Sequence, residues 1–281
     1  MCQASRVNRT MGSGGGGGRG AEVVGAVSRL LRRSIAHRGV VGTAGFILEL
    51  AFNRRFWRRA FGKDGTAEFD ANFGIDTRAS LLQTEIQDIV NPNWIHGALY
   101  TPTPVERFRE MLAALPIRHQ EFTFIDFGSG KGRVLLLASE LPFRAIIGLE
   151  LSQNLHQVTL RNLASYHSET QACKKIDCLL MDAILYDVPL EPSVCYFFNP
   201  FQEPVMAQVV RRLEASLEAA PRPMFILYYT PLFQHLFATS KYFREFRATE
   251  YYAIYQSTEG GLSPDSFVPE PGVRERLSPS R

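Results

Sequence analysis

The sequence is poor in cysteine and lacks a long apolar run. Its four cysteines form no C-x-x-C pair, and they are too few for a disulfide-rich secreted protein. The longest apolar stretch, residues 39–52, contains Glu49 and is shorter than the roughly 20 residues that a membrane span needs. These absences predict a cytoplasmic protein without a transmembrane helix and without a structural metal site.

Acidic residues are scarce in the first part of the chain. Residues 1–63 hold 12 Lys/Arg and 2 Asp/Glu, whereas residues 64–281 hold 19 and 26, so net charges of +10 and −7 combine to the overall +3. Because the larger part is mildly acidic, nucleic acid is not an expected partner.

The two ends of the chain differ in composition from its middle. Residues 1–20 include five consecutive glycines and are expected to be a disordered leader, and the proline-rich residues 259–281 a disordered tail. Residues 21–104 are expected to form a basic helical extension and a lid segment. Its arginines have two open interpretations: a helix at an anionic membrane surface or acidic partner, or helices packed on the domain with a solvated basic face.

A strand, a glycine-rich turn and a helix are indicated by the sequence FTFIDFGSGKGRVLLLA, residues 122–138. Asp126 stands near the end of the apolar run, and such a turn can present backbone N–H groups to a ligand at the edge of an α/β sheet. The lysine of the turn is followed by glycine rather than by the Ser or Thr of a P-loop. Arg133 stands where a dinucleotide-binding fingerprint has its third glycine, so neither of these motifs is present.

The remaining pattern, D-x-G-x-G-x-G with the acid first, resembles the first motif of class I, seven-strand S-adenosylmethionine (SAM) methyltransferases. An ordinary tight turn is the alternative. The resemblance implies an α/β fold with a doubly wound, mostly parallel seven-strand sheet, here over residues 105–258. It also implies SAM as cofactor, with its methionyl end against Asp126 and the loop. The loop residues in question are Gly128, Ser129, Gly130 and Gly132.

Two further acidic residues stand where the next strands are expected to end. Glu150 follows Gly128 by 22 positions, which is the length of one turn, one helix and one strand, and its two oxygens can accept both ribose hydroxyl protons. The alternative is a cap for a helix that starts near Ser152. By the same resemblance, Asp182 and Ala183 after the third strand would contact the adenine ring.

A fourth apolar strand runs into Asn199-Pro200-Phe201. This resembles the N-P-P-Y/F signature of class I enzymes that methylate nitrogen, and more nearly the N-x-F of seven-strand histone-lysine methyltransferases. There the Asn side-chain carbonyl and the next backbone carbonyl accept hydrogen bonds from the target nitrogen, and an aromatic ring flanks it. The second proline is missing here, which leaves the acceptor open. Phe201, Tyr228 and Tyr229 are candidates for the acceptor pocket.

Two short clusters precede the glycine loop. Tyr100-Thr101-Pro102-Thr103-Pro104 resembles the pre-motif of several lysine methyltransferases, where it covers bound SAM. Tyr100, Thr101 and Thr103 are therefore candidate cofactor contacts, with a plain loop as the alternative. The polar–aromatic cluster of residues 69–77 is consistent with a loop.

Together the motifs resemble bacterial class I methyltransferases of unknown substrate and seven-strand protein-lysine methyltransferases. We expect SAM-dependent methyl transfer, to a nitrogen such as a protein lysine amine ahead of a small-molecule oxygen or carbon. Asn199, Pro200 and Phe201 would be the catalytic residues. Two other classes stay open, a SAM-fold scaffold without transfer activity and a NAD-binding oxidoreductase.

Overall fold

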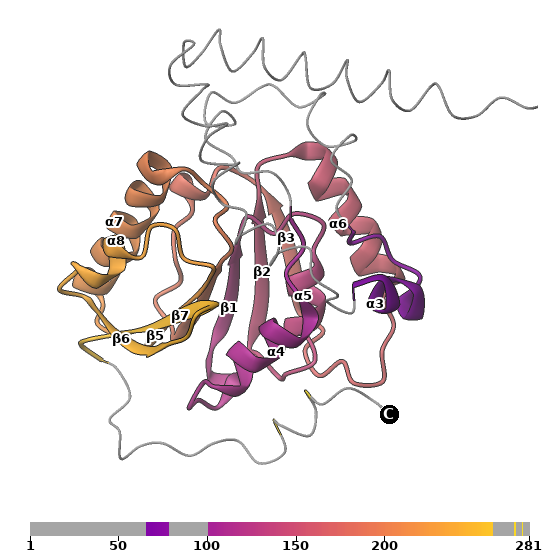
Figure 1. The fold of residues 1–281 in the computed structure, drawn as a ribbon, viewed down its shortest axis with the longest axis horizontal. Helices are drawn as coiled ribbons and strands as arrows, with labels where there is room; N and C mark the ends of the chain where they lie inside the picture. The colour runs from indigo at the N-terminus through magenta and orange to yellow at the C-terminus, as the bar shows by residue number, and fades with distance from the viewer. Residues whose placement is uncertain (1–65, 79–100, 261–272, 274–276, 278–281) are drawn as a thin grey trace, which may run out of the picture. The chain divides into compact units, whose positions relative to one another are not determined.

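The computed structural model describes residues 66–78 and 101–260, together with residues 273 and 277 (Figure 1). The expected leader, most of the basic extension, Tyr100 and most of the expected tail lie outside the described residues. The expectations for these parts of the chain stay predictions.

A seven-stranded sheet forms the centre of the described structure, with the order β3-β2-β1-β4-β5-β7-β6. β1 to β5 run parallel, and β7 is antiparallel to both β5 and β6. This order is typical of the Rossmann-like methyltransferase fold and confirms the predicted doubly wound, mostly parallel sheet. The strands are β1 (Thr123–Phe127), β2 (Ala145–Glu150), β3 (Ile176–Leu180), β4 (Ser193–Phe197), β5 (Met224–Tyr229), β6 (Phe243–Ala248) and β7 (Tyr252–Ser257).

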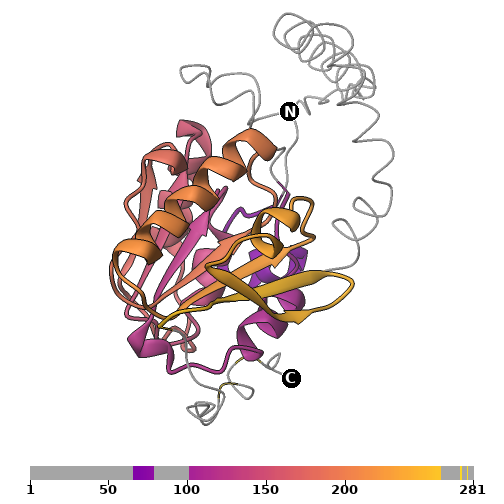
Figure 2. The same ribbon diagram turned by 90° about the vertical axis from the view of Figure 1, so that its left-hand side faces the viewer.

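The central strands are apolar because helices cover both faces of the sheet (Figures 1 and 2). Every residue of β1, β4 and β5 is buried. One face packs against α4 (Val105–Ala113), α5 (Arg133–Ala138) and α6 (Gln153–Ser165), and the other against α7 (Glu203–Ala219) and α8 (His235–Ala238). Two short 3-10 helices, η2 (His119–Glu121) and η3 (Ala183–Leu185), complete the domain.

The helices follow the apolar spacing of the sequence. In α4, Val105, Phe108, Met111 and Leu112 form the buried face, as their i, i+3, i+4 spacing predicts. In α7 the buried residues recur at the same spacing.

Residues 66–78 differ from the loop that their composition suggests. They form helix α3 (Thr66–Phe73), followed by a turn at Gly74 and an extended piece that reaches Thr77. Phe69 is buried and lies against Phe73 and Tyr166, with ring centroids 5.2 and 6.4 Å away. The aromatic contacts with the end of α6 explain why this segment adopts a fixed structure.

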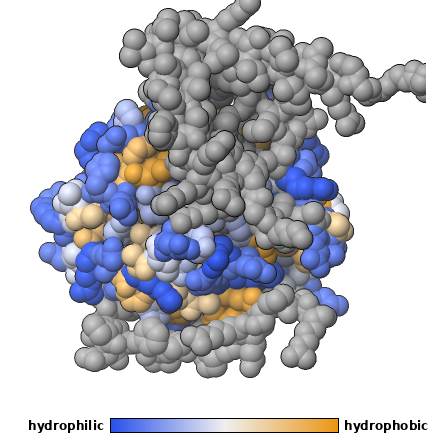
Figure 3. Space-filling model, viewed as in Figure 1, coloured by the Kyte–Doolittle hydropathy of each residue, from blue (hydrophilic) through white to orange (hydrophobic). Residues whose placement is uncertain are grey.

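The outer surface of the described domain is mixed in polarity. Hydrophobic residues on the face shown in Figure 3 form small patches separated by hydrophilic ones. Among the described residues, no helix combines the length and apolar character that crossing a bilayer requires.

Candidate functional site

β1 lies at the point where the sheet reverses its strand order, between β2 and β4. Ligands of doubly wound sheets bind outside the carboxyl ends of the strands at such a point. The glycine loop follows β1 there, and Asn199 and Pro200 follow β4. The sheet thus brings two predicted motifs to the same edge.

The glycine loop needs residues without a Cβ atom. Gly128, Gly130 and Gly132 have φ values of 88°, 56° and 83°, which L-residues with side chains rarely adopt. A Cβ at Gly128 would lie 2.5 Å from Cβ of Pro200, and one at Gly132 would lie 2.7 Å from Cγ2 of Thr159. The loop after β1 is therefore in close contact with both the end of β4 and helix α6.

The backbone N–H groups of the loop bond within the chain. Gly128 and Ser129 both donate to the Leu149 carbonyl at 2.9 Å, and Gly132 donates to the Ser129 carbonyl at 2.8 Å. Gly130 donates to Oε2 of Glu150 at 2.7 Å. At these four positions the N–H groups therefore have acceptors within the chain, three of them on β2 and one in the loop itself.

Asp126 is a buried acid, only 2% exposed, and no hydrogen bond joins its carboxyl to another residue in the described part of the chain. Burial, and to a lesser degree the neighbouring Glu150 carboxylate, raise the pKa of Asp126 well above its usual range. A buried carboxylate without hydrogen bonds is costly unless a cation pairs with it. The end of β1 thus provides a place where a cationic group would bind.

Glu150 links the end of β2 to the loop. Its Oε2 accepts from Gly130 N, and its Oε1 accepts from Ser152 N at 2.8 Å. A carboxylate can accept about four hydrogen bonds, so these two do not exhaust it. The helix cap that we considered as its alternative role belongs to Ser152, whose Oγ accepts from Leu155 N at 3.2 Å.

Asp182 lies at the same edge, after β3. Met181 N donates to the Glu150 carbonyl at 2.9 Å, which holds the ends of β2 and β3 together. Oδ1 of Asp182 accepts from Ile184 N at 3.1 Å and caps η3, while Ala183 is buried. Asp126, Glu150 and Asp182 therefore stand at the carboxyl ends of three neighbouring strands, as predicted.

Asn199 joins the ends of β4 and β5. It has a φ of 44°, unusual for a residue other than glycine, and it is buried. Its Nδ2 donates to the Thr230 carbonyl at 2.8 Å, and its Oδ1 accepts from the Tyr228 hydroxyl at 2.8 Å and from Leu232 N at 3.3 Å. The side-chain oxygen thus already has two donors, which favours a positioning role over contact with an acceptor nitrogen.

The other residues predicted around the acceptor do not all lie together. Pro200 packs against Gly128, and Phe201 is half-buried beside the core under α7 and α8. Tyr228 lies in that same core, whereas Tyr229 points to the opposite face and contacts Phe198, with centroids 4.8 Å apart. Alternation along β5 separates the two tyrosines, so only Tyr228 can contribute to a pocket with Phe201.

The segment before α4 contacts both the sheet and α5. Thr103 is buried, and its Oγ1 lies 2.7 Å from the Tyr196 hydroxyl on β4. Its carbonyl accepts from Nη1 of Arg133 at 3.2 Å. Thr101 is half-buried, and Tyr100 is outside the described residues. Their cofactor contacts stay predictions.

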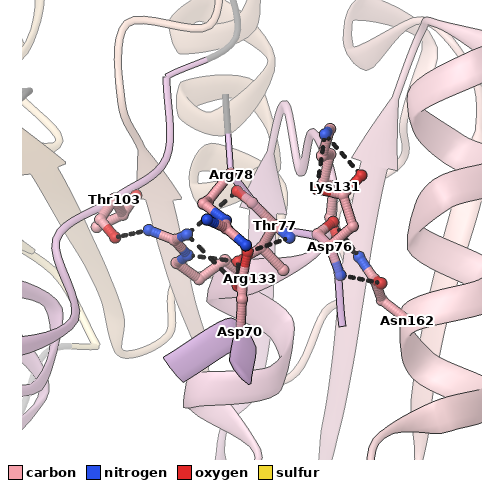
Figure 4. A network of polar contacts seen from close by, with 8 residues as sticks. All are labelled: Asp70, Asp76, Thr77, Arg78, Thr103, Lys131, Arg133 and Asn162. Atoms are coloured by element: carbon pink, nitrogen blue, oxygen red, sulfur yellow. Dashed lines mark hydrogen bonds and ion pairs between the residues drawn. The ribbon is translucent and has the colours of Figure 1, made fainter. Parts of the chain in front are cut away.

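Two ion pairs that the sequence did not predict bind residues 70–78 to the glycine loop (Figure 4). Arg133 is buried, and its Nε and Nη2 donate to Oγ1 and the carbonyl of Thr77 at 2.8 and 3.2 Å. Nη2 also lies 3.7 Å from Oδ1 of Asp70, which in turn accepts from the Thr77 hydroxyl. Lys131 Nζ donates to both carboxylate oxygens of Asp76 at 3.0 Å.

The two basic side chains of the loop are therefore paired with carboxylates of the chain itself. A loop arranged in this way has its positive charges directed to protein rather than to a ligand pyrophosphate. The only sequence signal for the network was a pair of acids in an aromatic stretch, Asp70 and Asp76, and two cations in the loop. Nothing in that pattern indicates which acid pairs with which cation.

The described residues at this edge of the sheet contain no cluster of metal-ligating side chains. Within residues 66–78 and 101–260, His, Cys, Asp and Glu side chains do not gather in threes as metal ligands would. Cys173, Cys178 and Cys195 are free thiols, and burial raises the pKa of Cys178 to about 11.

Similarity to known proteins is found among solved structures. No protein-family model and no curated protein matches the chain. Solved structures similar to it include a ribosomal protein L11 methylase from Lactobacillus delbrueckii subsp. bulgaricus, 14% identical with a TM-score of 0.37, over 56% of this chain and 77% of that one. An RNA methyltransferase from Salinibacter ruber in complex with S-adenosyl-L-homocysteine is 18% identical with a TM-score of 0.38, over 60% and 99% of the two chains.

An rRNA methylase from Streptococcus thermophilus is 12% identical with a TM-score of 0.39, over 55% of this chain and 96% of that one. Because these scores are low, the assignment of the fold depends on the strand order. By that order the chain has the Rossmann-like fold of class I SAM-dependent methyltransferases.

Proposed function

We propose that this protein binds SAM at the carboxyl edge of the sheet and transfers its methyl group to an acceptor. The observation that carries the proposal is the Asp126 carboxyl, which is buried at the switch point of the sheet without a hydrogen bond to another described residue. SAM carries a cation that can pair with this carboxylate, its methionyl ammonium. Its binding would offset the cost that burial imposes on the charged carboxylate.

The residues around Asp126 fit the rest of the cofactor. Gly128, held against Pro200, allows the chain to approach a ligand closely because no side chain stands in the way. Glu150 would hold the ribose hydroxyls, and Asp182 would accept from the adenine amine. These roles are assigned by the resemblance to the family motifs, and they are supported by the order of the acids at the ends of β1, β2 and β3.

The chemistry requires alignment more than acid–base catalysis. When bound, SAM supplies a methyl group on a sulfonium, which passes by in-line displacement to an acceptor lone pair while the sulfur keeps the electrons of the broken C–S bond. The chain's own residues orient the cofactor and exclude water. Holding two reactants in line can supply roughly 7–11 kcal/mol of the barrier.

The more specific part of the proposal is that the methyl acceptor is a nitrogen atom. It is supported by Asn199-Pro200-Phe201 after β4, which lies against the glycine loop through the contact between Pro200 and Gly128. Asn199 would act by fixing the backbone of this turn, since its side chain bonds to Tyr228, Thr230 and Leu232. A lysine acceptor would have to lose a proton before transfer, and a desolvating pocket lowers its pKa from about 10.4.

The structure gives the oxidoreductase alternative less support than the sequence does. Dinucleotides carry a pyrophosphate, whereas Lys131 and Arg133 are paired with Asp76 and Asp70. A scaffold without transfer activity differs from an enzyme only in what it does with bound SAM.

The test begins with calorimetry of the full chain with SAM and, separately, with NAD. We expect SAM to bind and NAD not to bind. Transfer of labelled methyl from SAM to proteins and small molecules of a lysate, followed by mass spectrometry, would then identify the acceptor atom. Binding of NAD in place of SAM would refute the proposal, and SAM binding without any labelled product would leave the scaffold.

A further inference from the structure

The segment of residues 69–78 is attached to the domain by two different kinds of contact. Its aromatic end, Phe69 and Phe73, packs against Tyr166 at the end of α6. Its polar end, Asp76 and Thr77, bonds to the glycine loop and the first residue of α5. The two ends are joined by Asp70, whose Oδ2 accepts from Thr77 N at 2.9 Å.

The polar end touches the loop backbone as well as its side chains. Asn162 on α6 donates through Nδ2 to the carbonyls of both Asp76 and Lys131, at 2.7 and 2.9 Å, and its Oδ1 accepts from Asp76 N at 3.0 Å. One amide therefore holds residue 76 and the loop in fixed relation. A displacement of Asp76 would have to move the backbone between Gly130 and Gly132.

The ion pairs are unequal in burial. Asp70 and Arg133 are both almost completely buried, with 1% and 2% of their side chains exposed. Lys131 is 2% exposed but its partner Asp76 is 60% exposed. If the segment left the loop, Lys131 and Arg133 would lose their carboxylate partners. The docked segment thus contributes to the conformation of the loop.

We propose that residues 69–78 are a positioning element of the cofactor site, and that the Asp76–Lys131 and Asp70–Arg133 pairs couple docking of this segment to SAM binding. The inference rests on the proposed function. The loop holds three glycines at positive φ, and because glycine has more backbone freedom than other residues, ordering the loop costs conformational entropy. A segment that fixes this conformation in advance raises affinity without touching the ligand.

Coupling of this kind is reciprocal. If docking favours SAM, then SAM must favour docking to the same extent. Bound SAM should therefore slow hydrogen exchange at the amides of Ile75, Asp76 and Thr77, although none of them is a predicted cofactor contact. This readout separates coupling from a role in stability alone.

The experiment compares SAM affinity and hydrogen exchange in four full-length proteins: wild type, Asp76→Asn, Asp76→Glu and Glu121→Gln. Asp76→Asn removes the charge that pairs with Lys131 while the aromatic anchor remains, and we expect SAM to bind about tenfold more weakly. Asp76→Glu keeps the charge and should restore affinity to within about threefold of wild type. Glu121→Gln breaks a more exposed pair, with Arg118 at 2.8 Å, before the opposite end of β1 and should change nothing.

Two results would have different meanings. Wild-type protein that binds no SAM would refute the proposed function and this inference with it. Wild-type binding that Asp76→Asn leaves unchanged, together with exchange at residues 75–77 that SAM does not slow, would refute this inference alone. Thermal melting of each variant verifies that it is folded.

Discussion

Asn199 at the end of β4 and Thr230 at the end of β5 share the same unusual backbone conformation, each with a φ of 44°. Nδ2 of Asn199 donates to the carbonyl and to the hydroxyl oxygen of Thr230, at 2.8 and 3.1 Å. Leu232 N can only donate and the Thr230 carbonyl can only accept, so the amide of Asn199 has one orientation. Strained residues of this kind concentrate at functional sites, where the surrounding contacts hold them.

Asn199→Ala should therefore affect both stability and transfer. It would leave the Tyr228 hydroxyl and the Thr230 carbonyl without their partner, at a cost of about 1–3 kcal/mol in the free energy of unfolding. We expect SAM affinity within a few-fold of wild type and methyl transfer about a hundredfold slower. Tyr228→Phe removes the bond to Oδ1 and the bond that the hydroxyl accepts from Phe233 N at 3.3 Å, and it is the control for denaturant unfolding. Equal losses of SAM binding and transfer in Asn199→Ala would assign the residue to the cofactor site instead.

Gly128→Ala tests the contact between the loop and Pro200. The new methyl group would lie 2.5 Å from Cβ of Pro200, at a residue with a φ of 88°. Gly74→Ala imposes a comparable backbone strain, about 1–2 kcal/mol, but meets no atom within 4 Å. We expect Gly128→Ala to be the less stable of the two by thermal melting and to bind SAM at least about tenfold more weakly than wild type. Equal stability would show that Pro200 moves aside easily.

Asp126→Asn should stabilise the protein while weakening SAM. The pKa of Asp126 is higher in the folded protein than in the unfolded chain. The stability that the protonated side chain contributes is therefore fully present below the unfolded pKa, about 3.9, and is lost as pH rises through the folded pKa. Asn does not titrate, and the advantage of the variant should therefore grow from pH 4 toward neutral pH. Each 1 kcal/mol would raise Tm by about 2–4 °C.

SAM affinity in the same variant provides the second measurement. Without the carboxylate the ammonium loses its partner, and we expect binding about tenfold or more weaker. Wild-type affinity should fall at low pH, where Asp126 is protonated, and the variant should lack this dependence. A variant that melts below wild type at neutral pH would contradict the inferred cost of burying Asp126.

Glu150→Ala should weaken SAM roughly ten- to a hundredfold, because hydrogen bonds to a charged group contribute about 1.5–3 kcal/mol. The variant also loses the bonds from Gly130 N and Ser152 N. Ser152→Ala removes only the helix cap, so it should cost about 1 kcal/mol of stability and leave SAM affinity unchanged. A folded Glu150→Ala protein with wild-type affinity by calorimetry would show that the ribose site is elsewhere.

The fold and the sheet edge of the candidate site could be predicted from the sequence. The runs of β1, β4 and β5 are mostly apolar because both faces of these strands are buried, and such runs can be recognised without coordinates. Asp126, Glu150 and Asp182 each follow or end an apolar run. In a parallel sheet the carboxyl ends of the strands meet at one edge, so the position of each acid after its strand was enough to place all three acids there.

Which polar groups pair with one another could be learned only from the tertiary structure. Asp70 and Arg133 are 63 positions apart in the sequence, and no periodicity relates them. Whether the Asn199 amide faces a ligand or Thr230 depends on the turn after β5, which lies 31 residues away. Pairings of this kind follow from where the strands and helices come to rest, because charge and hydrogen-bonding capacity specify what a side chain can bind but not which partner it meets.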